Sequence, residues 1–458
     1  MHTQATNTEN QEVAPTTPSV ENVSVDTQKS ILEPKVETTG LTRKKIEAME
    51  DVRIVDREEI DGESLEMFCY NKSPSETTDI KALECRGIVF HGDNLVLPGY
   101  PYTYEHTTAD MDKLVFGEDF FADAKIFVSH EGNLIKLFYF NNRWYIATNR
   151  KFNAFKSKWA SKDSFGTLFK KALTSLAETS EEFRAKLPEG EEPVLDKFYS
   201  LLNPSKQYIF LTRNSEENRI VCSPPDVPTV YHVGTFIDGK LDIEENVGVP
   251  FPEALSFASA AELKAYVEGI DYTKSQGVII FLPNNCHQVK IYNTEYMNLF
   301  RLRGNEPSIK FRYLQVRMDK KQRHALAKLY PNNVGEFQKY EELLYDISKI
   351  ILGAYTQRYI KKNYVTVPRQ EYKVIKACHD WHREDMKNNR ISQDKVMEIL
   401  NEQAPTDINN MLRRFNSEKI EKAKLQERRD RTSSGGRLSS SVYGSSPAPQ
   451  PTLLRPNA

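Results

Sequence analysis

The sequence lacks several patterns that would assign it to a common class of protein. Its five cysteines are scattered and form no CxxC pair, so neither a disulfide framework nor a structural zinc site is indicated. No run of about 18 apolar residues occurs, as a membrane-spanning helix requires, and no apolar signal region is found at the N-terminus. The phosphate-binding P-loop pattern is also missing. These absences predict a soluble intracellular protein in a reducing compartment, without a membrane partner.

Charge of one sign is not in excess either. The formal net charge is −2 over 458 residues, so any contact with nucleic acid must come from local clusters of basic side chains. Residues 1–40 contain no Phe, Tyr or Trp, and residues 431–458 are rich in Ser, Gly and Pro. Such segments bury too little apolar surface to offset the entropy lost on ordering, so both are predicted to be disordered tails.

Between these tails, the spacing of apolar residues predicts two domains. Short apolar runs separated by turn residues predict strands up to about residue 315, and spacings of three and four residues predict helices. The expected strands are 67–70, 87–90, two within 125–139 that form a hairpin about Gly132, 144–147, 208–212, 219–222, 230–233, 235–237, 277–281 and 287–291. The expected helices are 164–176, 179–203, 258–267, 337–355, 369–387, 392–402 and 407–429. This pattern predicts an α+β domain with an antiparallel sheet over residues 41–317, and an all-helical domain over 318–430.

One short stretch carries the chemistry. Ser129-His130-Glu131-Gly132 follows an apolar strand and resembles the signature of covalent nucleotidyltransferases (RNA and DNA ligases and mRNA capping enzymes). That signature is lysine, any residue, an acidic residue and glycine, so serine stands here where the family has its nucleophilic lysine.

Further elements in the same order resemble bacteriophage-type RNA ligases over about residues 80–300. These are Cys85–Phe90 with its Arg-Gly pair, the basic run 148–159, the strand 210–213 followed by Asn218-Arg-Ile-Val221, Gln276-Gly277, and Lys290-Ile-Tyr292. The stretch Arg303–Tyr313 resembles the divergent ligase-like proteins of large DNA viruses. Through this resemblance, the expected fold is an antiparallel-sheet, ligase-like nucleotidyltransferase domain followed by the helical domain.

The resemblance implies an ATP- and Mg²⁺-dependent reaction. In the family, the lysine amine attacks the α-phosphate of ATP, AMP passes to a 5′-phosphate end, and a 3′-hydroxyl then displaces it. The implied nucleotide-binding positions in this chain are Arg86, Glu131, Gly132, Thr212, Gln276 and Lys290. Four positions depart from the pattern, since Ser129 replaces the nucleophile, Thr212 and Gln276 replace carboxylates, and Tyr292 replaces a phosphate-binding lysine.

These departures leave three hypotheses. A serine needs a base to accept its proton, and a neutral amide is a poorer ligand for Mg²⁺ than a carboxylate, so the first is a catalytically impaired protein that binds RNA or nucleotide. The second is an active RNA ligase that uses a displaced lysine, either Lys125 or Lys136, with ATP and Mg²⁺ as cofactors. The third is a structural or interaction component, for example of a virion, with the helical domain as the docking surface for a protein partner. A viral origin would locate the protein in the host cytoplasm or in the virion.

Two other patterns have a functional and a structural interpretation. Arg150, Lys151, Lys156 and Lys158 alternate with aromatic residues, which suits contact with RNA phosphates and bases but equally suits a solvated loop with its apolar side in the core. Cys378 and His382 stand four residues apart on an expected helix. Two ligands do not make a zinc site, so no metal site is predicted.

Overall fold

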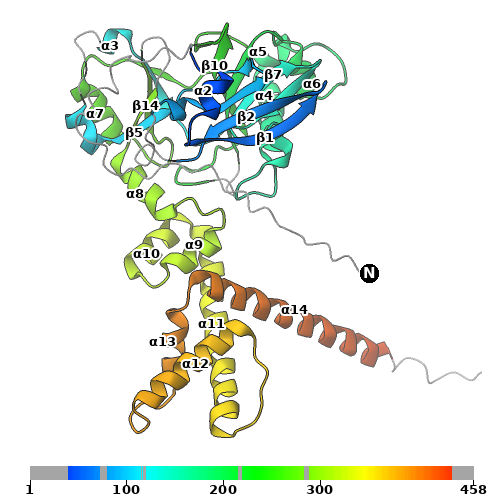
Figure 1. Cartoon of the computed structure of the whole chain (residues 1–458), viewed down its shortest axis with the longest axis vertical. Coiled ribbons are helices and arrows are strands. Elements are labelled where there is room, and N and C mark those ends of the chain that lie inside the picture. The colour runs from blue at the N-terminus through cyan, green and yellow to red at the C-terminus, as the bar shows by residue number, and fades with distance from the viewer. Residues whose placement is uncertain are drawn as a thin grey trace, which may run out of the picture. The chain divides into compact units, whose positions relative to one another are not determined.

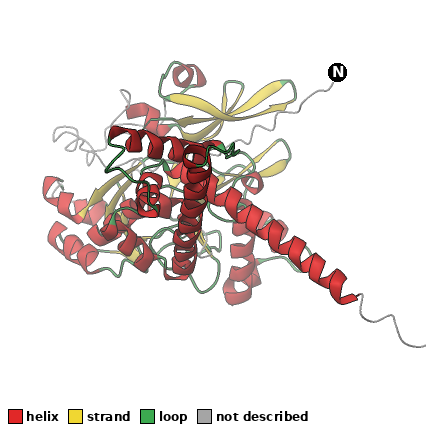
Figure 2. Cartoon of the chain, turned by 90° about the horizontal axis from the view of Figure 1, so that it is seen from below, coloured by secondary structure: helices red, strands yellow, loops and turns green. Residues whose placement is uncertain are grey.

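The computed structural model describes residues 40–72, 80–114, 116, 120–214, 219–282 and 288–435. The chain divides into two compact units after Arg312 (Figure 1). All strands of the described residues lie in the first unit, and the described part of the second unit consists of helices and loops (Figure 2). The α+β class with antiparallel sheets and a helical C-terminal region is therefore confirmed. In the described part of the chain, none of the helices combines the length and the apolar character needed to cross a membrane.

The first unit contains three sheets. The first has the order β1-β2-β3-β4, the second β11-β10-β9-β7-β8 and the third β12-β6-β13-β14-β5. Among the described residues, all strand pairs are antiparallel except β14 with β5. The strands of the first sheet are β1 (Val52–Ile60), β2 (Glu63–Tyr70), β3 (Arg86–His91) and β4 (Asn94–Leu97). Those of the second are β7 (Asn133–Phe140), β8 (Arg143–Ala147), β9 (Gln207–Arg213), β10 (Thr229–Ile237) and β11 (Lys240–Asp242). Those of the third are β5 (Thr103–Thr107), β6 (Lys125–Ser129), β12 (Ala254–Leu255), β13 (Gly277–Phe281) and β14 (Gln288–Tyr292).

The second sheet is buried on both faces. Ile135 and Leu137 of β7 point to one face, where they pack in a core with α4 (Phe165–Thr179), α5 (Glu181–Lys186) and α6 (Val194–Tyr199). Phe138, the next residue of β7, points to the opposite face and packs with Met67 and Val89 of the first sheet. This alternation follows the two-residue period of a strand, and it explains why β7 reads as a nearly continuous apolar run.

Shorter helices complete the first unit. These are α2 (Arg43–Glu47), η1 (Ile80–Glu84), η2 (Thr108–Lys113), α3 (Phe120–Asp123), η3 (Ala154–Lys156), α7 (Ala260–Gly269) and α8 (Thr294–Arg303). The helix α7 packs on the third sheet through Leu263 and Val267. Ser259 caps its N-terminus by accepting a hydrogen bond from the backbone of Glu262, as its position in the sequence predicts.

The second unit is built around α11 (Val334–Tyr355). The other helices are α9 (Ile309–Val316), which crosses the division between the units, α10 (Lys320–Leu329), η6 (Pro331–Asn333), η7 (Thr356–Ile360), α12 (Arg369–Glu384), α13 (Gln393–Asn401) and α14 (Pro405–Gly435). An ion pair links α11 to the end of α9, because the buried Arg317 guanidinium donates to both carboxylate oxygens of the partly exposed Glu341, at 2.9 and 2.7 Å. The predicted tails lie outside the described residues, apart from Gly40 and residues 431–435. Gly40 is the first described residue, and residues 431–435 belong to α14.

Several local predictions are wrong for identifiable reasons. The helix expected over 179–203 is divided into α5 and α6, because Pro188, Gly190 and Pro193 interrupt it. The strands expected at 230–233 and 235–237 are one strand, β10, with a register shift between His232 and Gly234. The sequence Pro283-Asn284-Asn285 predicts a turn between the strands expected at 277–281 and 287–291, and it lies outside the described residues.

Candidate functional site

The stretch around Ser129 does not form the predicted hairpin. Ser129 ends β6 and pairs with Gly277 of β13, whereas Asn133 begins β7 and pairs with Thr212 of β9. Residues 130–132 therefore cross from the third sheet to the second. A Cβ atom on Gly132 would lie 2.6 Å from the carbonyl oxygen of Thr212, so glycine is required here by the close approach of β9 and not by a hairpin turn.

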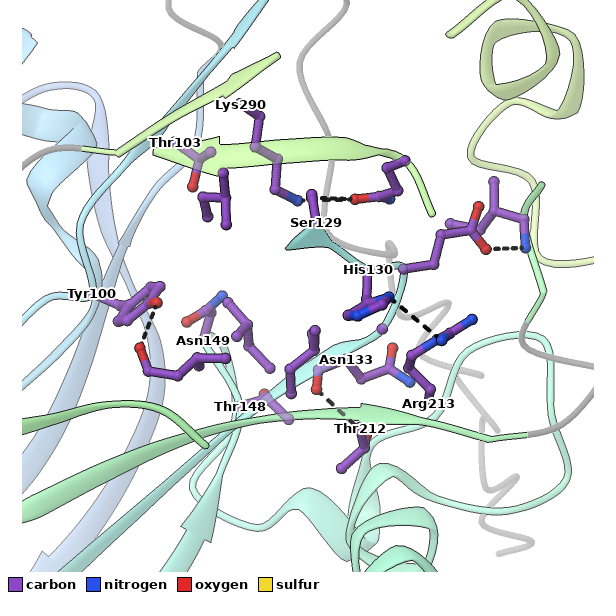
Figure 3. A pocket seen from close by; sticks show the side chains of 18 of the residues that line it. Tyr100, Thr103, Ser129, His130, Asn133, Thr148, Asn149, Thr212, Arg213 and Lys290 are labelled. Atoms are coloured by element: carbon purple, nitrogen blue, oxygen red, sulfur yellow. Dashed lines mark hydrogen bonds between the residues drawn. The ribbon is translucent and has the colours of Figure 1, made fainter. Parts of the chain in front are cut away.

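A cavity of about 660 Å³ lies beside this crossover, and residues of all three sheets line it. Its size falls in the range of about 300–1,000 Å³ that is typical of small-molecule sites. Figure 3 shows side chains that line the cavity. Lys290 and Thr103 approach from one side, Thr148 and Thr212 lie on the opposite side, and Ser129 lies between them.

Ser129 belongs to a buried hydrogen-bond network. Its hydroxyl donates to Oε1 of Gln276 at 3.0 Å (Figure 3), and Lys290 Nζ donates to the same oxygen at 3.2 Å. The amide nitrogen of Gln276 in turn donates to the Tyr296 hydroxyl at 2.7 Å. The hydrogen-bond acceptor of Ser129 is thus the neutral amide of Gln276, which accepts no proton at physiological pH. Gln276 stands at a position where the resemblance places a carboxylate.

Glu131 braces the loop that follows β9. Its buried carboxylate accepts hydrogen bonds from the backbone nitrogens of Ile220, Val221 and Cys222, at 3.2, 2.7 and 3.0 Å. Burial raises the pKa of Glu131, although these three donors oppose the shift. The strand predicted at 219–222 is therefore wrong, because these amides bond to a side chain instead of a neighbouring strand. Asn218 lies outside the described residues.

Lys290 and Glu105 face each other on neighbouring parallel strands. The two residues pair in the register of β14 and β5, and Tyr292 donates its hydroxyl to the Glu105 carboxylate at 2.8 Å. Burial raises the pKa of Glu105, and Lys290 and Arg86 oppose this shift. Burial likewise lowers the pKa of Lys290, and Glu105 opposes that shift. Tyr292, which occupies the place of the family's second lysine, thus ties a carboxylate to the wall of the cavity.

His130 and Arg213 form another part of the wall. The His130 ring stacks on Tyr231, with centroids 4.8 Å apart and planes inclined by 5°. Arg213 lies 3.5 Å from His130 Nδ1 (Figure 3). Burial lowers the pKa of His130 to about 4, with smaller contributions from Arg213 and Lys290, so the ring is neutral at pH 7.

The predicted basic run divides between cavity and surface. Arg150, Lys151 and Lys158 line the cavity, whereas Lys156 is exposed on η3 and is not part of the lining. Trp159 also lines the cavity, and the Arg303 guanidinium lies 5.3 Å from its ring centroid.

The two alternative lysines lie outside the cavity lining. Lys125 is half exposed and forms an ion pair with Glu244. Lys136 is fully buried, and its Nζ donates to the carbonyl oxygens of Arg86 and Gly87 at 2.6 and 3.1 Å. Burial lowers the pKa of Lys136 to about 7, with a smaller contribution from Arg86.

The implied nucleotide positions come together in this cavity. Arg86, Glu131, Gly132, Thr212, Gln276 and Lys290 all line it. Glu105, Arg213 and Arg53 line it too, although none of the sequence patterns above singles out their side chains. Alternation of Thr103, Glu105 and Thr107 along one strand face was the available signal for Glu105.

The Cys378 and His382 pair points to different partners. Cys378 is buried, which raises the pKa of its thiol to about 11, and His382 Nδ1 lies 2.6 Å from the Asn389 carbonyl oxygen. The intervening His379 stacks on Tyr359 with centroids 3.8 Å apart.

Comparisons with known proteins point to viral relatives and to ligases. No family model matches the chain. It is 27% identical over 386 residues to an immediate-early protein ICP-46 homolog of Invertebrate iridescent virus 6, covering 78% of this chain and 81% of the relative. It is 24% identical over 245 residues to the immediate-early protein ICP-46 of Frog virus 3 (isolate Goorha), covering 50% of this chain and 58% of the relative.

Among solved structures, the chain is similar to a putative ATP-dependent DNA ligase from Aquifex aeolicus. The TM-score is 0.36 with 14% identity, over 65% of this chain and 78% of that one. An archaeal ATP-dependent RNA ligase also has a TM-score of 0.36, with 11% identity over 69% of this chain and 78% of that one. The chain is thus similar in sequence to iridovirus immediate-early proteins and has ATP-dependent ligases among its structural neighbours.

Proposed function

We propose that this chain is a ligase-like protein that binds a phosphorylated nucleotide in the cavity without becoming covalently attached to it. The nucleotide is either free or the end of an RNA strand. The observation that carries the proposal is the hydrogen bond from Ser129 to Gln276, because it fixes a hydroxyl and an amide where the resemblance places a nucleophilic amine and a carboxylate.

Covalent attachment would need a base beside Ser129. A hydroxyl becomes a competent nucleophile only when a neighbouring group removes its proton. Gln276 accepts the Ser129 hydrogen bond but is a neutral amide, and Lys290 donates to the same oxygen. The contacts of Ser129 therefore favour a non-reactive hydroxyl.

A displaced lysine receives little support from Lys125 and Lys136. The ammonium of Lys125 pairs with Glu244, and Lys136 donates to two backbone carbonyls. An attacking amine must approach the α-phosphate of a nucleotide in the cavity, and neither side chain belongs to its lining.

The composition of the lining favours a phosphorylated nucleotide. Arginine and lysine side chains supply charge-assisted donors for phosphate. The neutral His130 ring, backed by Tyr231, supplies an aromatic surface of the kind on which bases stack. Viral structural roles and a protein partner for the helical unit remain predictions.

Binding and attachment are tested separately. Isothermal titration with ATP should give saturable binding that weakens in Arg213→Gln and is unchanged in Lys156→Gln, whose lysine lies outside the lining. A lack of ATP binding, together with a lack of binding to 5′-phosphorylated RNA, would contradict the proposal. Ser129→Lys alone should fail to restore adenylylation, because Thr212, Gln276 and Tyr292 would remain.

A further inference from the structure

The lining of the cavity has a strong excess of positive charge. The whole chain carries a formal charge of −2, yet among the described residues eight basic side chains and two carboxylates line the cavity. The basic residues are Arg53, Arg86, Arg150, Lys151, Lys158, Arg213, Arg219 and Lys290, and the acidic ones are Glu105 and Glu131. Such a site concentrates anions and repels free cations.

Both carboxylates are engaged by groups of the protein. Glu131 accepts three backbone N–H bonds, and Glu105 accepts the Tyr292 hydroxyl beside Lys290. The three bonds to Glu131 occupy most of the acceptor sites of that carboxylate, and the positive charge of Lys290 beside Glu105 would repel a cation.

The side-chain oxygen of Gln276 is also poorly suited to bind a metal cation. Oε1 of Gln276 already accepts hydrogen bonds from Ser129 and from the Lys290 amine. Mg²⁺ prefers carboxylate and phosphate oxygens, and an ammonium group within hydrogen-bond distance of the same oxygen would repel it. Within the described ranges, no three His, Cys, Asp or Glu side chains cluster so as to hold a metal ion. The described residues of the lining therefore do not fit the Mg²⁺ that the ligase resemblance implies.

We infer that the cavity takes the phosphate chain of its nucleotide in metal-free form, with protein cations in the place of Mg²⁺. This inference rests on the proposed nucleotide binding and specifies the ionic form of the ligand. Lys290 and Arg86 are the central cations, since both line the cavity next to Glu105, and Arg86 is anchored by hydrogen bonds to Pro101 O and Thr103 Oγ1, at 3.3 and 3.4 Å.

The expected effect of Mg²⁺ on ATP affinity is opposite to that for a metal-dependent ligase. Chelation by Mg²⁺ neutralises two negative charges of a triphosphate and so weakens its attraction to the basic side chains of the cavity. Because no described carboxylate is available to coordinate the ion, no bond between protein and metal offsets this loss. Free ATP should therefore bind more tightly than its magnesium complex, on the order of tenfold, which corresponds to about 1.4 kcal/mol.

The test is a pair of titrations of the full chain with ATP at equal ionic strength, one in EDTA and one in excess MgCl₂. Tighter binding in EDTA is the expected result. Binding that requires Mg²⁺, or is tightened by it, would overturn the inference while leaving nucleotide binding intact. Absence of ATP binding in both media, together with absence of binding to 5′-phosphorylated RNA, would instead refute the proposed function.

Substitutions locate the effect in the cavity. Lys290→Gln should weaken binding in EDTA and reduce the difference between the two media, and Lys156→Gln should change neither value. Gln276→Glu should weaken binding in EDTA and introduce a preference for Mg²⁺. If Lys290→Gln unfolds, Arg150→Gln, at a half-buried position of the lining, tests the same expectation.

The two sources of a phosphate chain are separated by a second ligand pair. A short RNA with a 5′-triphosphate is compared with the same RNA ending in a 5′-hydroxyl, again in both media. Tighter binding of the triphosphate end in EDTA supports the inference for RNA ends, and an Mg²⁺ requirement for that end contradicts it.

Discussion

The hydrogen bonds that Glu131 accepts predict a large loss of unfolding free energy when this side chain is removed. In Glu131→Ala, the buried backbone N–H groups of Val221 and Cys222 and the partly buried one of Ile220 lose their acceptor. Hydrogen bonds to charged groups each contribute about 1.5–3 kcal/mol, and the three are not additive because one side chain makes them all, so we expect a loss of about 3–5 kcal/mol. That is a large part of the roughly 5–15 kcal/mol that stabilises a typical protein.

Glu131→Gln refines the calculation. Oε1 accepts from Val221 and Cys222, and an amide oxygen can keep these two bonds. The third donor, Ile220 N, bonds to Oε2 and would face an NH₂ group instead. The expected loss is therefore that of one bond to a charged group, about 1.5–3 kcal/mol.

The assay is urea denaturation followed by the fluorescence of Trp144 and Trp159, which lie in the first unit. Glu244→Ala is the matched control, because it removes an exposed carboxylate whose ion pair with Lys125 is expected to contribute at most about 1 kcal/mol. A loss below 1 kcal/mol in Glu131→Ala, combined with loss of ATP binding, would refute the reasoning and make Glu131 a ligand contact instead of a brace.

Three further predictions concern stability. The pKa of Lys136 is lowered to about 7 in the folded state, so the unfolded chain binds more protons than the folded chain between about pH 7 and 10. The unfolding free energy should therefore rise with pH over that window, by up to about 1.4 kcal/mol per pH unit. Urea titrations at each pH should show this rise in the wild-type chain and its absence in Lys136→Met. Gly132→Ala forces a Cβ against the β9 backbone and should cost about 1–3 kcal/mol, whereas Gly269→Ala, which meets no atom within 4 Å, should not destabilise; equal midpoints for the two variants would contradict this. Arg317→Ala removes both guanidinium bonds from the Glu341 carboxylate, which is partly exposed and keeps the Tyr313 hydroxyl, so the helical unit should lose about 1–3 kcal/mol of unfolding free energy. Urea denaturation followed by far-ultraviolet circular dichroism measures this loss, and a change under about 0.5 kcal/mol would count against it.

Sequence patterns predict much of the local structure. Asparagine tolerates left-handed backbone, so Asn141-Asn142 predicts a two-residue hairpin turn, and the φ angles of these residues are positive, 47° and 57°. The Ser259 cap and the long amphipathic α11 also follow from residue spacing. In each case the deciding interactions lie within a few residues of one another.

Partners distant in sequence were the main source of error. Residues 125–139 were predicted to form a hairpin, because the sequence does not reveal that β6 pairs with β13 and β7 with β9. Residues 219–222 have strand composition, but their amides bond to Glu131, about ninety positions earlier. Glu105 was missed because its functional role depends on its contact with Lys290. The parallel pairing of β5 with β14 places the two residues side by side, and the sequence does not show this pairing.

Covalent labelling tests most directly whether the cavity binds its nucleotide without reacting with it. The full chain is incubated with α-labelled ATP in Mg²⁺ and in EDTA, denatured, and separated from free nucleotide, with Lys290→Gln alongside to identify any reactive amine in the cavity. No label should remain on the wild-type chain, although ATP binds before denaturation. A protein–AMP adduct that survives denaturation would contradict the account.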